Sequence, residues 1–542
     1  MARASRLLAA SLAAAAALAV VLLLSSHQGP AAGGGEEAGR LVISYGDWGP
    51  LTPFAFYPRG PGYVAASLVF DTLVWKDERG LVPWLAESWE SLDGGRVWVF
   101  HLRRGVRWSD GEPLTAGDVV FTFEYMSRHG WHWGGVNFSR IESIEAPDPY
   151  TVVFRLKGPD PFFAEDVAAT VFIIPRHVWE GVGDPYTYRG PGATVGSGPY
   201  VVESYEPGRG YVLKANPYWW GPRQLYGTLV LAAPGGITEP RASAEALVSG
   251  EADAAAFMGK AWRLVRLVEE RVEGVRVEKG PMYWVAFLGF NLDRWPTSSP
   301  VFRRAVAYAL NLTELVLRAV GSLEAAVPGA PGYVPPYSWF YSPRLPRSFT
   351  YDPVEAGRLL EGLGLRDVDG DGCRELPNGT AWRPLLVAPR QLEQEALVVG
   401  EMLRRVGVCV RVKTVASFKQ LDSLVKGGGF DMVVSGHGAA GNSVKALSWV
   451  FTRIAPAWSS GEYRRLAAAL AGAASRQEAL EAAYAIEELA AGELPRIALY
   501  YPYIYLVERP GVEARFFFTW GGIDGGVPLP WNKMALLREE PG

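Results

Sequence analysis

The sequence predicts an α/β protein that is built from more than one lobe. A chain of 542 residues is too long for one ordinary hydrophobic core, so two or three lobes are expected. In the last third, helical patterns at 391–406 and 418–426 alternate with strand patterns at 408–414 and 430–435. Such β-α-β alternation predicts a parallel α/β sheet.

The first part of the chain alternates strand and turn signals. Residues 41–45 form a predicted strand, and the Gly- and Pro-containing residues 46–50 after it predict a loop. Residues 96–102 alternate as a strand does, with β-branched and aromatic side chains among them. Thr115, followed by Asp118 and an apolar run, predicts a helix N-cap with a capping-box partner.

Further elements are predicted along the rest of the chain. The patterns indicate helices at 239–249, 301–311 and 476–491, and strands at 253–257, 283–290 and 496–501. Gly250 ends the first of these helices. The helix at 301–311 is amphipathic, and Arg303 and Arg304 are expected off its apolar face. Asp352 as N-cap and Pro353 as first helical residue open another helix.

The composition argues against one class of partner and favours another. The chain has 53 basic and 57 acidic residues and a net charge of −4, which gives no basic footprint for nucleic acid. It also has 20 tryptophans, an unusually high number. Many must lie in the core, but some of them are suited to line a ligand-binding surface.

The N-terminus, residues 1–40, has the pattern of an export signal followed by a stalk. Arg3 and Arg6 precede an unbroken apolar stretch at 7–24, and a Gly- and Ala-rich stretch at 25–39 follows. The apolar stretch is also just long enough to span a membrane. No cysteine follows it, which excludes a lipid-modified cysteine anchor. Export to the extracellular or periplasmic face is expected, with residues 7–24 either cleaved or retained as a membrane anchor.

Three groups of residues share their order with a known family. Residues 81–126 contain PWLAESW, a strand, HLRRGV and SDGEPLTAGDV. Residues 196–200 read GSGPY, and NPYWW follows at 216–220. The strand at 283–290 ends at Asn291 and leads to the helix VFRRAVAYALN. Together these groups resemble the signatures of the family 5 extracellular solute-binding proteins, the peptide, oligosaccharide and nickel receptors of ABC importers. The resemblance covers about residues 41–540.

The resemblance implies a periplasmic-binding-protein-like fold of type II. Two hinged lobes would enclose a cleft, and an extra subdomain would sit on lobe one. Lobe one would comprise 41–63, 186–280 and 502–542, its subdomain 64–185, and lobe two 281–501. The chain would cross between the lobes near 282–287 and 500–503, and the lobes would close over ligand by hinge bending.

The function that the resemblance implies is capture rather than catalysis. A di- or oligopeptide would bind between the closing lobes of a monomer and pass to ABC permease subunits in the membrane, with no cofactor required. The sequence contains neither a G-x-S-x-G elbow nor a G-x-x-x-x-G-K-[ST] loop, so an enzyme is not expected. An extracellular hydrolase and a sensory receptor stay open as alternatives from other classes.

Candidate ligand contacts come from loops that follow strands, because such sheets place ligands beyond the carboxyl ends of their strands. The candidates are Asp47, Trp48, Met258, Trp262, Tyr283, Trp284, His437 and Asn442.

The loop at 435–442 decides between two kinds of ligand. Peptide-binding relatives carry an aspartate there that pairs with the α-amino group of the ligand, and the matching position here is Ala440. A buried ammonium needs a partner. Either Asp47 or another carboxylate supplies the anion for a peptide, or the ligand is uncharged, such as an oligosaccharide held by tryptophan stacking and by His437 and Asn442.

An acidic loop and a cysteine pair lie close together in the last third. Asp367, Asp369 and Asp371, followed by Gly372, match the first half of an EF-hand calcium loop, and Glu375 adds a carboxylate. The twelfth position is Asn378 rather than Glu, so weak structural Ca²⁺ binding is the expectation, and a solvated turn is the alternative. Cys373 and Cys409 could form a disulfide in an exported chain, or remain two thiols.

Overall fold

The computed structural model of the protein describes residues 39–56, 60–131, 136–438, 443–454, 456–523 and 529–538. The predicted signal at 7–24 and residues 439–442 of the predicted loop at 435–442 lie outside these residues. None of the helices in the described ranges is long and apolar enough to cross a membrane.

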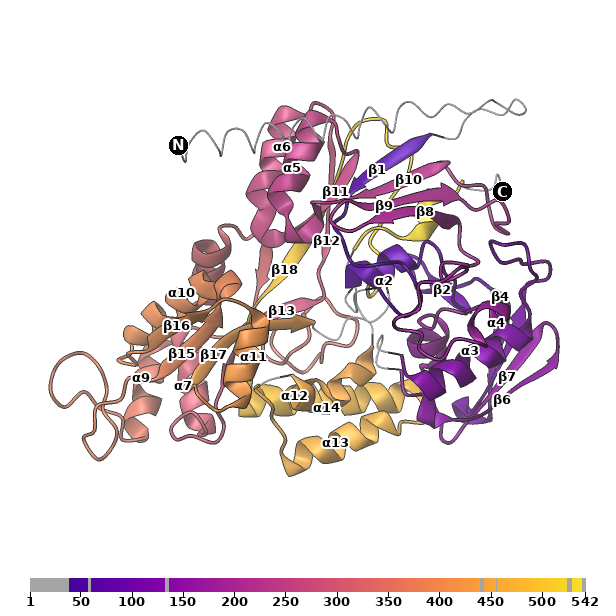
Figure 1. Ribbon diagram of the computed structural model, residues 1–542. Helices are drawn as coiled ribbons and strands as arrows, with labels where there is room; N and C mark the ends of the chain where they lie inside the picture. The colour runs from indigo at the N-terminus through magenta and orange to yellow at the C-terminus, as the bar shows by residue number, and fades with distance from the viewer. Residues whose placement is uncertain are drawn as a thin grey trace. The chain divides into compact units, whose positions relative to one another are not determined.

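The described residues form a mixed α/β structure, as the sequence predicts (Figure 1). Within them, twelve strands make one sheet in the order β16-β15-β17-β13-β18-β11-β1-β10-β9-β8, and β12 and β14 also pair with β18. The part of the sheet around the last residues of β18 contains β1 (Arg40–Ser44), β8 (Tyr200–Glu206), β9 (Gly210–Ala215), β10 (Thr228–Ala232), β11 (Ala254–Met258) and β12 (Arg276–Pro281). The part around its first residues contains β13 (Trp284–Phe290), β14 (Ala326–Pro328), β15 (Leu385–Pro389), β16 (Arg411–Val415) and β17 (Met432–Gly438).

Strand β18 (Arg496–Glu508) belongs to both parts of the sheet. Its residues 496–502 pair with β13 and β14, and its residues 503–508 pair with β11 and β12. Tyr503 stands at the change of partners and is the one residue of the strand that is not fully buried. The sequence predicts only the first half of this strand, at 496–501.

The parallel arrangement predicted for the last third is found in part. Strand β15 pairs in parallel with both β16 and β17, so the β-α-β alternation there is confirmed. Strand β13 pairs antiparallel with β17 and with β18, which makes the whole sheet mixed.

Residues 60–179 form smaller sheets and helices of their own. Strands β4, β5, β7 and β6 make a four-stranded antiparallel sheet, and β2 and β3 make a two-stranded one. Their bounds are β2 (Val74–Lys76), β3 (Leu81–Pro83), β4 (Ala86–Leu92), β5 (Val97–Leu102), β6 (Ile141–Asp148) and β7 (Thr151–Leu156). The helices are α2 (Gly60–Ala66), α3 (Ala116–His129) and α4 (Arg176–Trp179).

The remaining helices cover the large sheet and close separate hydrophobic clusters. Helices α5 and α6 pack in one cluster with β11 and β18, whereas α7, α9 and α10 pack in another with β13 and β15. Their bounds are α5 (Pro240–Ser249), α6 (Trp262–Arg271), α7 (Pro300–Ala309), α8 (Leu312–Leu315), α9 (Pro353–Gly362), α10 (Glu393–Arg404), α11 (Phe418–Lys426), α12 (Val450–Arg453), α13 (Gly461–Ala471) and α14 (Arg476–Glu493).

The predicted helix starts are confirmed in detail. Thr115 caps α3 and forms the capping box with Asp118, whose Oδ2 accepts the Thr115 backbone N–H at 2.8 Å. Asp352 caps α9 by accepting the N–H of Glu355 at 2.9 Å, and Pro353 is the first residue of that helix. Gly250 ends α5 in the left-handed conformation that favours glycine.

The prediction that Arg303 lies off the apolar face of its helix is wrong. Arg303 is only 3% exposed, and its guanidinium donates to the backbone carbonyls of Thr297, Ser298 and Glu493. The helix pattern cannot reveal this, because the acceptors are loop carbonyls brought in by tertiary packing. Burial lowers the pKa of Arg303 to about 10.

Residues of two signature segments meet around one buried ion pair. Lys533 and Asp71 are fully buried, and Lys533 Nζ lies 2.5 Å from Asp71 Oδ1. Asp71 also accepts hydrogen bonds from Trp84 Nε1, Ser197 Oγ and Trp220 Nε1. The first signature contributes Trp84, and the GSGPY and NPYWW elements contribute the other two donors, so these signatures build the interior of the fold.

A second buried carboxyl group belongs to helix α14. The Oε2 atom of Glu487 accepts the N–H groups of Tyr333 at 2.8 Å and Val334 at 3.1 Å. Its Oε1 atom has no hydrogen-bond partner among the described residues. Burial raises the pKa of Glu487 to about 7, although the two N–H groups act in the opposite direction.

Replacing Lys533 by methionine is expected to destabilise the protein strongly. The substitution would leave the Asp71 carboxylate buried without its counter-charge, and breaking a buried pair in this way costs about 3–5 kcal/mol. Denaturant unfolding measures the loss. The control is Lys426→Met, which removes an exposed i,i+4 pair with Asp422 and is expected to cost about 0.5 kcal/mol or less. Equal effects of both variants would contradict the role of the buried pair.

Replacing Glu487 by glutamine is expected to change how stability depends on pH. The folded pKa is raised above the unfolded value of about 4.3, so the native state binds more protons between these values and loses stability as pH rises through them. The difference between wild type and Glu487→Gln should therefore grow between about pH 4.3 and pH 7, to a size on the order of 3 kcal/mol in favour of the variant. Unfolding measured from pH 4 to pH 8 tests this, and a constant difference would count against it.

Candidate functional site

Four half-buried aromatic residues from three distant segments lie together where the chain passes between the two parts of the sheet. Tyr283 lies in the crossing between β12 and β13, Tyr337 and Trp339 lie in the loop between β14 and α9, and Trp520 follows β18. These four residues are called the ring set below.

The rings of the set make two pairs. The rings of Tyr283 and Tyr337 are 6.1 Å apart, and those of Trp339 and Trp520 stack at 5.7 Å. The Tyr337 hydroxyl donates to the Met282 carbonyl at 2.9 Å. Burial raises the pKa of Tyr283, and a hydrogen bond with the Gly521 backbone partly offsets this rise. Because Gly521 follows Trp520 in the chain, the Tyr283 hydroxyl lies near Trp520. Rings held this way can stack on an apolar or planar group of a ligand.

Trp284 and His437 lie on neighbouring strands beside the ring set. In the β13–β17 pairing, Trp284 is opposite Gly438 and Val285 is opposite His437. The Trp284 ring lies over Gly436, where any larger side chain would collide with it. Trp284 is half-buried and packs against two of the hydrophobic clusters, so it adjoins both parts of the sheet.

Asp47 lies at the β8–β9 hairpin and is bound by the protein itself. Its carboxylate accepts hydrogen bonds from the N–H groups of Gly49 and Gly208 and from the hydroxyls of Tyr205 and Tyr211, at 2.7–3.4 Å. Burial alone would raise the pKa of Asp47, but these donors outweigh burial and lower the pKa. The carboxylate thus connects the loop after β1 to the hairpin through hydrogen bonds.

Three further candidates lie in separate places. Trp48 is buried in a core cluster and donates its backbone N–H to Tyr211 Oη at 2.8 Å. Met258 is opposite Ile504 in the β11–β18 pairing. Trp262 begins α6 and donates its Nε1–H to the Val320 carbonyl at 3.2 Å.

The structure therefore brings some of the predicted residues together and separates others. Tyr283 belongs to the ring set and Trp284 and His437 adjoin it, whereas Asp47 and Trp48 lie at the hairpin. Asn442 and Ala440 lie outside the described residues. Sequence reasoning missed Tyr337, Trp339 and Trp520, although a run of aromatic residues in Pro- and Gly-rich loops at 331–341 and 516–522 was a usable signal.

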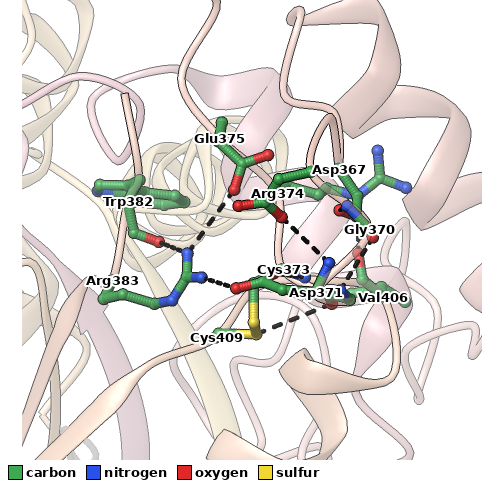
Figure 2. Close-up of a disulfide and its surroundings, with 12 residues drawn as sticks. Asp367, Gly370, Asp371, Cys373, Arg374, Glu375, Trp382, Arg383, Val406 and Cys409 are labelled. Atoms are coloured by element: carbon green, nitrogen blue, oxygen red, sulfur yellow. Dashed lines mark hydrogen bonds and ion pairs between the residues drawn. A yellow bond between two sulfur atoms is a disulfide. The ribbon is translucent and has the colours of Figure 1, made fainter. Parts of the chain in front are cut away.

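The predicted calcium loop has its carboxylates close together, but one of them binds an arginine (Figure 2). One oxygen each from Asp367, Asp369 and Glu375 lie within 4.8 Å of one another. Asp371 instead pairs with Arg383, whose Nη1 also lies 4.0 Å from Glu375 Oε1. Ca²⁺ binding at this loop stays a prediction.

The disulfide between Cys373 and Cys409 is formed, with the two Cα atoms 5.5 Å apart (Figure 2). It joins the acidic loop to the segment that precedes β16, across 36 residues of sequence. Arg374 adds to this connection by donating to the carbonyls of Val406 at 2.9 Å and Leu365 at 2.7 Å. The loop is thus fixed to the neighbouring helix and strand.

Comparison with solved structures defines the class of fold. The structure of AppA from Bacillus subtilis in complex with a nonapeptide aligns with a TM-score of 0.70 at 21% identity, covering 90% of this chain and 97% of that chain. A periplasmic oligopeptide-binding protein from Thermotoga maritima, solved with mannohexaose bound, aligns with a TM-score of 0.68 at 25% identity, covering 93% and 97%. The fold is that of a type II periplasmic binding protein, which confirms the predicted class.

Comparison of sequences identifies the family. Residues 80–456 match the bacterial extracellular solute-binding proteins, family 5 middle region, and the chain belongs to this family. The oligopeptide-binding protein AppA of Bacillus subtilis is 25% identical over 344 residues, which are 61% of this chain and 60% of AppA. The dipeptide-binding protein of Escherichia coli is 27% identical over 307 residues, 53% of this chain and 55% of that protein. The matches thus span less than two thirds of these relatives.

Removing the disulfide is expected to destabilise the protein by about 3–4 kcal/mol, because the loop that it closes would gain freedom in the unfolded state. The variant is Cys373→Ala with Cys409→Ala, and denaturant unfolding measures the loss. A reductant should destabilise the wild type by a similar amount and leave the double variant unchanged. An equal effect of reductant on both proteins would contradict this account.

Proposed function

We propose that this protein is an exported receptor that captures a di- or oligopeptide and delivers it to the permease of an ABC importer. Membership in the solute-binding family is the observation that carries the proposal. The names of two relatives, an oligopeptide-binding and a dipeptide-binding protein, support peptide as the ligand class. The receptor acts as a monomer, requires no cofactor and performs no chemistry on its ligand.

The proposed division into lobes follows the sheet. Residues 41–63, 186–280 and 502–542 form lobe one, residues 64–185 its subdomain, and residues 281–501 lobe two. The strand order supports this division, because β18 changes partners at 502–503 and β12 gives way to β13 at 281–284. The lobes close about these two crossings, and a ligand that binds the closed state better shifts the protein toward it.

The ring set is the proposed ligand contact. Its four members come from both lobes, so a ligand that stacks on them bridges the two crossings. Trp284 and His437 adjoin it from the β13–β17 ladder. Asp47 is a poor ammonium site because four protein donors already occupy its carboxylate. The anion for a peptide's α-amino group then comes from elsewhere, or the peptide binds through its side chains and backbone.

An oligosaccharide is the second candidate ligand, and one observation favours it. The Thermotoga maritima relative is a periplasmic oligopeptide-binding protein that was solved with mannohexaose. Aromatic rings stack on sugar faces as well as on peptide side chains, so the ring set suits either ligand. A hydrolase is distinguished from both because it would turn the ligand over.

Ligand binding is tested by native mass spectrometry of protein purified from its source, followed by thermal unfolding with defined peptide and oligosaccharide pools. A peptide retained by the protein, and a rise in Tm with peptides alone, would support the proposal. A rise with oligosaccharides alone would replace peptide by sugar. No rise with either pool, or cleavage of the added ligand, would overturn the proposal.

Removing a ring of the ring set is expected to weaken binding of the retained ligand. Trp339→Ala and Trp520→Ala each remove one half of the stacked pair, and each should raise Kd at least tenfold, which corresponds to about 1.4 kcal/mol. Isothermal titration measures Kd. The control is Tyr218→Ala, which removes an aromatic residue that is 45% exposed and should leave Kd unchanged. Unchanged affinity in both tryptophan variants would exclude the ring set.

A further inference from the structure

A short segment of the subdomain inserts into lobe two. Phe162 is 2% exposed and belongs to a hydrophobic cluster in which every other buried member lies between residues 285 and 501. The segment around it is fixed to its own subdomain, because Asp160 donates its N–H to the Gly95 carbonyl at 3.0 Å. Phe162 therefore belongs to the subdomain by chain connectivity and to lobe two by packing.

Two ion pairs flank this phenylalanine. Asp160 pairs with Lys445, and Glu165 pairs with Arg476. Asp160 and Glu165 are 6% and 9% exposed, so their charges depend on these partners. Glu165 Oε2 is buried without a hydrogen-bond partner among the described residues, which makes Arg476 more important to this carboxylate.

Cations also cover the ring of Phe162 on lobe two's side. Lys445 Nζ lies 5.8 Å and Arg476 Cζ lies 4.8 Å from its centre. Both acidic groups come from the subdomain and both basic groups from lobe two, so the two surfaces are complementary in charge. Arg140 extends the contact by donating to the Ala471 carbonyl at 2.8 Å, where α13 ends beside the sheet of β6 and β7 (Figure 1).

We propose that Asp160, Phe162 and Glu165 of the subdomain and Lys445 and Arg476 of lobe two form a clasp that stabilises the closed arrangement and slows ligand release. The inference rests on the proposed function. Opening about β18 would expose Phe162 to water, which is unfavourable, and would separate both ion pairs. The five residues act as positioning residues, since none of them is a proposed ligand contact.

The clasp also adjoins the proposed ligand contact. The ring of Phe162 lies 6.4 Å from that of Trp339, which stacks on Trp520. A ligand that orders the ring set would order the surface against which Phe162 packs, so ligand binding and clasp formation favour each other.

The test measures the distance between the lobes and needs no ligand. Fluorescent labels are placed at Arg79→Cys and Val354→Cys, on side chains that are 91% and 82% exposed. Single-molecule energy transfer is compared between the parent and Lys445→Ala with Arg476→Ala. The fraction of molecules at the longer distance should rise at least fivefold in the variant, with unchanged circular dichroism.

Controls separate the clasp from general destabilisation. Arg405→Ala removes an ion pair with Glu314 that lies within lobe two, and it should leave the distance distribution unchanged. The charge swap Asp160→Lys with Lys445→Asp should restore a parent-like distribution relative to Lys445→Ala. A clasp variant with the parent distribution, or an equal shift in Arg405→Ala, would overturn the inference. Arg476→Ala alone, at a half-exposed side chain, provides the same test if the double variant does not fold.

A second measurement links the clasp to release. Dissociation of the peptide retained in native mass spectrometry is followed by tryptophan fluorescence in a stopped-flow instrument, and the clasp variant should release it at least tenfold faster than the parent. An unchanged rate of peptide dissociation would contradict the proposal that the clasp slows ligand release. Because the distance measurement uses protein alone, failure of the clasp is distinguishable from failure of peptide binding.

Discussion

Strand β18 connects both parts of the large sheet. Its first residues complete the β13–β14 part of the sheet, and its last residues complete the β11–β12 part. The two parts of the sheet cannot rotate freely against each other, because each is hydrogen-bonded to one half of the same strand. Relative motion of the two parts is therefore concentrated at the two connections between them. One is Tyr503, where β18 changes partners, and the other is the segment between β12 and Trp284. The ring set lies at that place, and Lys279 lies over Tyr503 at 4.6 Å.

Two groups of buried contacts lie away from these crossings, and they differ in how they are held together. Around Asp71 and Lys533, hydrogen bonds from two signature segments and a buried ion pair join residues 71–84 to residues 197–220 and to Lys533. The clasp consists of one inserted ring and two charge pairs between segments separated by about 300 residues. The first arrangement resists separation, whereas the second can break and reform without disrupting either hydrophobic core.

Much of the fold could be predicted from the sequence, because local signals determine where elements begin. The capping box at Thr115 and the N-cap at Asp352 were sufficient to locate two helices. The pairing of the strands was harder to predict, because β13 has the same apolar pattern whether it pairs in parallel or antiparallel. Arg303 was misplaced because its acceptors are carbonyls from a loop and from the end of α14. For the site, the predicted crossing between the lobes gave Tyr283 and Trp284, but Tyr337, Trp339 and Trp520 come together only through the topology. Asp47 does follow a strand, as predicted for a ligand contact. Its carboxylate instead accepts hydrogen bonds from the β8–β9 hairpin and so has a structural role.

The proposed capture of a ligand requires two lobes to close about β18. Small-angle X-ray scattering of the protein, with and without a saturating concentration of its retained ligand, measures this closure. The radius of gyration is expected to decrease when the ligand is bound. Tight binding with an unchanged radius of gyration would contradict it, since the ligand would then occupy a site that forms without closure.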